Sequence, residues 1–140
     1  MRSMWGYLFK ENISMNLNLT EIRVNKCEYR NEITSYAKLN LNVNMTNQIR
    51  LPKKLEADSV GAVITKIMVG SPLEPFYLFI EQVSHYKDSN PEQGFVQDSE
   101  ELMSMYKTIC IPIAIDKAEE TIQNLCKTYH IPEIKIQKKA

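Results

Sequence analysis

The feature that most constrains this chain is a strict alternation of apolar and polar residues over positions 37–45. Successive side chains of a β-strand point to opposite faces of a sheet, so such a pattern predicts a strand with one dry and one wet face. Lysine and asparagine stand at the even positions. The apolar residues at the odd positions are Ala37, Leu39, Leu41, Val43 and Met45.

Three further segments have the composition of strands. Residues 17–29 alternate, but the phase changes between Leu19 and Ile22 and again between Val24 and Cys27, as it would in a strand with β-bulges. Residues 60–69 and 76–83 are rich in β-branched or aromatic side chains and are apolar on both faces for part of their length. Helices must then cover one face of these two strands and something else the other, for which a partner subunit is the obvious candidate.

Helical spacing replaces this alternation after a polar loop over residues 87–97. Asp98, with a carboxylate three residues on, predicts a helix N-cap, and apolar residues follow at helical spacing until Pro112. Pro112 ends this first helix and opens a second one, which closes before Pro132. The expected order is ββββαα, an α+β fold in which a four-stranded antiparallel sheet is followed by two helices. The stripe of the second helix comprises Ile115, Ala118, Ile122, Leu125 and Tyr129.

Composition argues against several classes of function. The 140 residues carry 17 basic and 17 acidic side chains, which gives no electrostatic reason to expect a nucleic acid or an anionic membrane as partner. No glycine-rich nucleotide-binding motif occurs, and the apolar stretch 5–9 is too short for a secretory signal or a membrane span. Cys27, Cys110 and Cys126 are odd in number and widely spaced, which favours a reducing compartment. We therefore expect a cytoplasmic protein.

One domain is expected from the length. Residues 1–14 look separable, because the strand pattern starts only around Leu17 and Met15 could itself be a start codon. We expect an N-terminal arm or a misassigned start over residues 1–14 and one folded domain over residues 15–140.

The residues available for catalysis are few. His85 and His130 are the only imidazoles and show no metal-ligand spacing, so neither a metal site nor a cofactor is expected. Cys126 and His130 stand four residues apart on one helix, a spacing that suits a nucleophile and its base. However, Cys126 borders the apolar stripe and His130 falls where the helix ends. We expect no enzyme, and a small α+β enzyme based on this pair is the third alternative.

The C-terminal part of the sequence carries a resemblance to a known family. The run Tyr106-Lys-Thr-Ile-Cys-Ile-Pro112, continuing into the long helix, and the later run Ile131-Pro132-x-Ile134-x-Ile136 resemble the SecB family of protein-export chaperones in their spacing. The resemblance spans residues 17–136 and implies a four-stranded antiparallel sheet covered by two helices. His130 stands where many members have a Gly-Thr type turn. The chain ends without the extension that other members use to dock on SecA, so SecA docking is not implied.

This resemblance implies a function that needs neither catalysis nor ATP. SecB-like proteins hold unfolded chains in an apolar groove and assemble as dimers or tetramers. We therefore expect a homo-oligomeric holdase for unfolded polypeptides, with protein export as the process it could serve. The alternative is a dedicated adaptor or chaperone for a single partner, such as an antitoxin or a phage protein. The residues that the resemblance places in the client groove are Tyr29, Ile33, Tyr36, Phe76, Leu78, Ile109 and Ile113.

Overall fold

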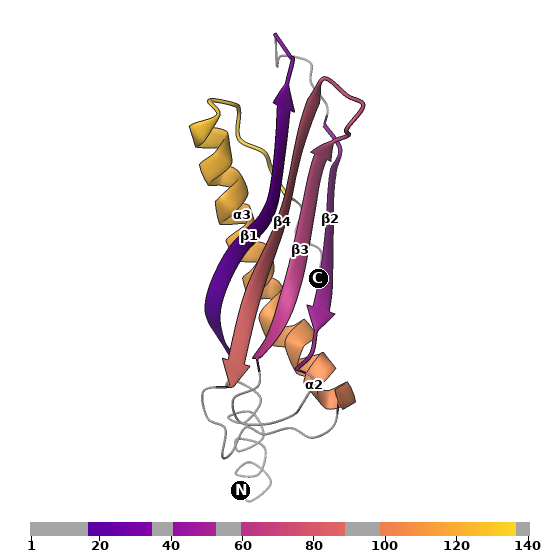
Figure 1. The fold of residues 1–140 in the computed structure, drawn as a ribbon, viewed down its shortest axis with the longest axis vertical. Coiled ribbons are helices and arrows are strands. Elements are labelled where there is room, and N and C mark those ends of the chain that lie inside the picture. Colours follow the sequence, from indigo (N-terminus) through magenta and orange to yellow (C-terminus); the bar gives the residue numbers. More distant parts are fainter. Residues whose placement is uncertain (1–16, 35–40, 53–59, 89–98, 137–140) are drawn as a thin grey trace, which may run out of the picture.

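The computed structural model describes residues 17–34, 41–52, 60–88 and 99–136. In chain order its elements are β1 (Leu17–Asn31), β2 (Val43–Arg50), β3 (Val60–Gly70), β4 (Phe76–Asp88), α2 (Ser99–Met105), η1 (Tyr106–Cys110) and α3 (Ile111–Thr128). A long, twisted four-stranded sheet lies against one long helical stretch (Figure 1). The predicted α+β class is confirmed. The arm expected at 1–14, the N-cap Asp98 and the site residue Tyr36 lie outside the described residues.

The four strands form one antiparallel sheet in the order β1-β4-β3-β2. The edge strands are therefore the first two strands of the chain, and the segment between them passes from one edge of the sheet to the other. β3 and β4 are joined by a tight turn that starts at Gly70, whose φ of 73° is unfavourable for any residue with a side chain. A Cβ at Gly70 would also collide with the backbone oxygen of Phe76.

Two β-bulges shape β1. The register against β4 shifts between Leu19 and Glu21 and again between Val24 and Lys26, so that Thr20 and Asn25 are the extra residues. These are the two places where the alternation in the sequence changes phase, and the predicted bulges are confirmed. Their effect is to keep the apolar residues of β1 on the face that α3 covers.

The two predicted helices are joined end to end in one helical stretch. The expectation that Pro112 ends the first helix is wrong, because η1 is a π-helical turn that leads directly into α3. The expectation that Pro112 stands in the first turn of the second helix is confirmed, since α3 starts at Ile111. There the N–H of Ile111 donates to the carbonyl of Tyr106, five residues back. Pro112 lacks an N–H, and its ring would crowd the carbonyl four residues before it in a regular helix. The wider π turn accommodates the proline without breaking the helix.

The core between sheet and helix has two apolar clusters. The upper cluster is built around Ile67, Leu78, Ile80 and Ile122. The lower cluster is built around Val63, Tyr86 and Tyr106. A layer of buried polar side chains separates the two clusters. Its hydrogen bonds are Thr65 Oγ1 to Asn47 Oδ1 (2.7 Å) and Thr121 Oγ1 to Gln82 Oε1 (2.6 Å). Tyr86 OH donates to Ser84 Oγ (2.9 Å) within the lower cluster.

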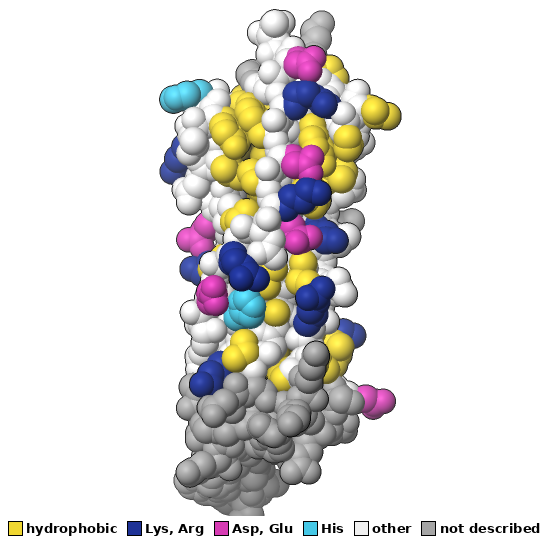
Figure 2. Space-filling model, in the orientation of Figure 1, with side chains coloured by type: hydrophobic (Ala, Val, Ile, Leu, Met, Phe, Trp, Pro, Cys, Tyr) yellow, Lys and Arg dark blue, Asp and Glu magenta, His cyan; other side chains and the backbone are white. Residues whose placement is uncertain are grey.

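The other face of the sheet carries no described element. Figure 2 views the molecule from this side, with basic and acidic side chains running along the face and apolar surface to either side of them. Ala62, Ile64 and Val83 are nevertheless each less than a tenth exposed there. The expected two-sided burial of β3 and β4 is thus present within the single chain, without the partner subunit that the sequence suggested as its cover.

Candidate functional site

An apolar groove runs between β2, α3 and the segment that follows α3. We call it the β2 groove. Its upper part, beside Phe76 and residues 131–134, is a hollow of about 230 Å³. Its lower part, beside Ile111 and Ile115 of α3, is a hollow of about 540 Å³. Leu41, Val43 and Lys135 line both parts. The other apolar residues that line one part or the other are Met45, Phe76, Ile111, Ile115, Ile131, Pro132, Ile134 and Ile136.

Strand alternation supplies one wall of the β2 groove. Along β2 the odd-numbered residues are half-buried and the even-numbered ones exposed. The sequence predicts this alternation for residues 37–45, but β2 starts only at Val43 and runs on to Arg50, so the prediction is confirmed for residues 43–45 alone. Val43 and Met45 therefore point to the α3 side of the sheet, and α3 contributes Ile111 and Ile115 to the facing wall. Of the charged residues described, only Glu133 and Lys135 line the groove. Asn42, Asn44 and Asn47 also line the lower part. The groove therefore offers a ligand apolar side chains together with amide groups.

The C-terminal wall depends on how α3 ends. His130 adopts a left-handed conformation with φ of 55°, and the N–H groups of His130 and Ile131 donate to the carbonyls of Lys127 (3.3 Å) and Cys126 (3.0 Å). These two bonds make a Schellman motif, which reverses the chain. Gln123 Nε2 then donates to the carbonyl of Ile134 and ties the returning segment to the helix.

The outer edge of β2 is open to a further strand. The N–H of Gly70 donates to the carbonyl of Asn42, so the even-numbered residues bond to β3. Neighbouring residues of an antiparallel strand direct their backbone groups to opposite sides, so those of Val43, Met45 and Asn47 point outward. No other strand among the described residues pairs with this edge. The residues with outward backbone groups are also the ones whose side chains face the α3 side.

An aromatic group lies near the upper end of the groove. The ring of Tyr29 stacks on that of Tyr129 with centroids 3.8 Å apart and meets Phe76 edge-on at 6.0 Å.

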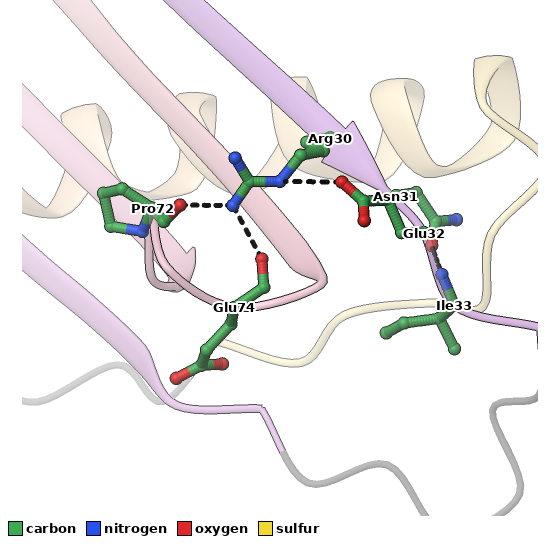
Figure 3. A network of polar contacts seen from close by, with 6 residues as sticks. All are labelled: Arg30, Asn31, Glu32, Ile33, Pro72 and Glu74. Carbon is green, nitrogen blue, oxygen red and sulfur yellow. Dashed lines mark hydrogen bonds and ion pairs between the residues drawn. The ribbon is translucent and has the colours of Figure 1, made fainter.

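Arg30, the next residue of β1, donates to the carbonyls of Pro72 and Glu74 and so fastens β1 to the turn between β3 and β4 (Figure 3).

The structure brings together only some of the residues that the sequence places in a client site. Tyr29, Ile33 and Phe76 all belong to the upper apolar cluster, and Phe76 lines the groove. Leu78 belongs to the same cluster but is wholly buried beneath α3. Ile109 and Ile113 pack on the lower cluster instead. Ile113 lies sixteen residues (129 − 113 = 16), or about 24 Å, along the helix from Tyr129, on which the predicted site residue Tyr29 stacks. The predicted residues therefore do not form one site.

Sequence reasoning missed most of the groove lining. The alternation over 37–45 predicts a dry strand face with Leu41, Val43 and Met45, and Ile134 and Ile136 enter only through the run that resembles the SecB family. Nothing in either pattern shows that these two segments face each other, although together they line the groove.

The thiols near the groove lack the properties of catalytic nucleophiles. Burial raises the pKa of Cys110 to about 12 and also raises the pKa of Cys126, whereas a catalytic thiol needs a lowered pKa. His130 is exposed and forms part of the turn that ends α3. Over residues 17–34, 41–52, 60–88 and 99–136, no group of three potential metal ligands comes together. In the same residues, no helix is long and apolar enough to cross a membrane.

Comparison with known proteins places the fold. No protein-family description and no curated protein sequence matches the chain. Among solved structures it is similar to the Rv1957 SecB-like chaperone of Mycobacterium tuberculosis, solved in complex with a ChAD peptide from the Rv1956 HigA1 antitoxin. The TM-score is 0.61 at 9% sequence identity, and the match covers 94% of this chain and 96% of that one. The fold is SecB-like. The ββββ order followed by one continuous helical stretch is thus shared over nearly the whole of both chains.

A second solved structure is similar at a lower level. It is a protein of unknown function from Streptococcus agalactiae, with a TM-score of 0.48 at 10% identity over 87% of this chain and 97% of that one.

Proposed function

We propose that this chain is a chaperone that binds non-native polypeptide segments in the β2 groove without ATP. The observation that carries the proposal is the coincidence of an apolar groove and an open strand edge at the same residues of β2. An extended segment laid along that edge would bond to the outward backbone groups of Val43 and Met45. Its alternate apolar side chains would enter the groove, a known mode of peptide recognition.

The chain itself offers a parallel for such a ligand. Ile134 is buried and Ile136 half-buried along the groove, while Lys135 between them is exposed. An extended segment with apolar residues at every second position therefore fits this surface. The SecB-like neighbour, which was solved with a peptide, supports the same class of function.

The test is suppression of aggregation of a chemically unfolded client, followed by light scattering. We expect the wild-type protein to suppress it and Met45→Asp to lose that ability, because a carboxylate in the groove must be desolvated when an apolar segment binds. Thr46→Asp is the matched control, since Thr46 is the next residue of β2 and is exposed on the opposite face. Equal activity of both variants, or no suppression by the wild-type protein, would contradict the proposal.

A dedicated adaptor for one partner is the second candidate. It is favoured by the fact that the SecB-like neighbour was solved with a peptide from a single antitoxin. Affinity capture with the full chain separates the two. Many substoichiometric clients indicate a holdase, which could serve export, and one stoichiometric partner indicates an adaptor.

We also propose that the chain self-associates through β1. Ile22 and Val24 are 39% and 44% exposed on this edge strand, and their register opposite Ser84 and Gln82 places them on the α3 side. A second copy would cover them. Light scattering behind size exclusion should give a dimer or tetramer of the 16.3 kDa chain, and Ile22→Lys should shift it toward monomer. A wild-type monomer would contradict this.

We place the protein in the cytoplasm. The three free cysteines suit a reducing compartment of that kind.

A further inference from the structure

The sheet face opposite α3 carries a second concave surface, separate from the β2 groove. This outer hollow has a volume of about 380 Å³, and its floor consists of Ala62, Ile64 and Val83. The register sets these residues in two rows across the sheet. Arg23, Val83 and Ile64 share one row with Gln48, and the next row runs from Glu21 through His85 and Ala62 to Arg50. An apolar floor thus lies between an arginine on each edge strand.

The charge around the outer hollow is predominantly basic. Arg23, Arg50 and Lys66 line it, with Glu81 as the lining acid. Glu81 is engaged by Lys66 at 3.7 Å, and nearby Glu21 lies 3.9 Å from His85 Nδ1.

The two arginines keep their charge available. Arg23 donates to the neutral amide oxygen of Asn25 at 2.7 Å. Arg50 has no ion pair within the part of the chain that the structure describes. Neither guanidinium forms an ion pair with another described residue, although Glu21 stands two residues from Arg23 on the same face. Three basic side chains (Arg23, Arg50, Lys66) therefore face two carboxylates (Glu21, Glu81) around the floor.

The spacing of the arginines selects the ligand. β1 and β2 are three strand spacings apart, or about 14 Å, and the two arginines stand in neighbouring rows, about 7 Å apart along the strands, so their Cα atoms are about 16 Å apart. In an extended chain, residues i and i+4 are about 13 Å apart, whereas in a helix they are about 6 Å apart. Carboxylates four residues apart in an extended segment can thus reach both arginines, each as a bidentate pair, while an apolar side chain between them covers the floor.

We propose that the outer hollow is a docking site for an acidic polypeptide segment in which two carboxylates, four residues apart in an extended chain, flank an apolar residue. This surface would recognise a partner by charge, whereas the β2 groove selects apolar segments. The two sites lie on opposite faces of the sheet and can be disabled separately.

The test measures binding of two fluorescently labelled peptides, Glu-Ser-Leu-Ser-Glu and Lys-Ser-Leu-Ser-Lys, to the full chain by anisotropy. The wild-type protein should bind the acidic peptide and not the basic one, and the affinity should fall as salt is raised from about 0.05 M to about 0.5 M. Arg23→Gln and Arg50→Gln should each weaken binding about fivefold. The double variant Arg23→Glu with Arg50→Glu should reverse the preference and bind the basic peptide, a gain that unfolding cannot produce.

Lys107→Glu with Lys127→Glu is the matched control. It changes the net charge by the same amount, but both exposed lysines lie on the helical layer. The proposal is overturned if the wild-type protein binds both peptides equally or neither, or if the control reverses the preference as well. Met45→Asp should leave acidic-peptide binding unchanged, so that failure of the β2 groove and failure of the outer hollow are told apart.

Discussion

Tyr29 of β1 and Tyr129 at the end of α3 stack face to face, with ring centroids 3.8 Å apart and ring planes within 6° of each other. The contact joins the edge strand to the point where the chain turns back over the sheet. Phe76 meets Tyr29 edge-on from β4. The stack thus holds the end of α3, and with it the C-terminal wall of the β2 groove, against the sheet.

Removing one ring of this stack should therefore cost stability. We expect Tyr129→Ala to lower the free energy of unfolding by about 2 kcal/mol, since Tyr129 is half-buried and the stacking is lost as well. Tyr129→Phe keeps the ring and should cost less than about 0.5 kcal/mol. Urea unfolding of the three proteins measures both values. Equal losses for the two variants would show that the ring contact contributes little.

The strands were predictable because their side-chain period is local. The alternation over 37–45 gave the correct face for Val43 and Met45, and the phase changes near Thr20 and Asn25 gave the correct bulges. Both follow from the direction of neighbouring side chains. No contact between distant residues had to be known.

The helical region shows where local rules stop. Pro112 was expected to separate two helices, because the rule for proline assumes a regular α-helix before it. The π turn over Tyr106–Cys110 accommodates Pro112 without ending the helix. Nothing in the composition distinguishes a helix that ends before the proline from one that continues through a π turn.

The candidate site was less predictable than the fold. The resemblance to the SecB family places Phe76 and Leu78 in the site; both are buried in the free chain, 2% and 0% exposed, and of the two only Phe76 lines the groove. Periodicity tells which face of its strand a residue occupies, but not which surfaces the chain leaves open. That depends on where the segment after α3 returns, and hence on the turn at His130.

His130 provides a direct test of that turn. A residue with a Cβ pays about 1 kcal/mol or more for the left-handed conformation, and glycine does not. We expect His130→Gly to raise the free energy of unfolding by about 0.5–1 kcal/mol. Thr128→Gly, at the last residue of α3, should instead lower it by about 0.3 kcal/mol. Thermal unfolding of both variants is the measurement, and destabilisation by His130→Gly would refute this account of the turn.

Gly61 of β3 is held as glycine by a neighbouring ring. A Cβ at this position would overlap the hydroxyl of Tyr106 and lie 2.8 Å from its Cε2, and that ring is 1% exposed. Because the ring has no room to move, Gly61→Ala should cost about 2 kcal/mol.

The reason for this cost can be isolated by a double-mutant cycle. In a Tyr106→Leu background the overlap is gone, so Gly61→Ala should cost less than it does in the wild-type protein. Denaturant unfolding of the four proteins gives the coupling. Strict additivity would mean that the backbone of β3, not the ring, disfavours alanine.

Stability should depend on pH in the alkaline range, because two neighbouring buried groups resist ionisation. Burial raises the pKa of Tyr86 from 10.0 to about 12 and that of Cys110 from 9.0 to about 12. Above about pH 9 the unfolded chain releases these protons while the folded chain keeps them, so the unfolded state binds fewer protons. The free energy of unfolding should therefore be unaffected by these groups below pH 9 and fall from there to about pH 12. Urea titrations at several pH values measure this slope, which Cys110→Ala should make shallower. An unchanged slope in Cys110→Ala would mean that the thiol ionises without opening the cluster.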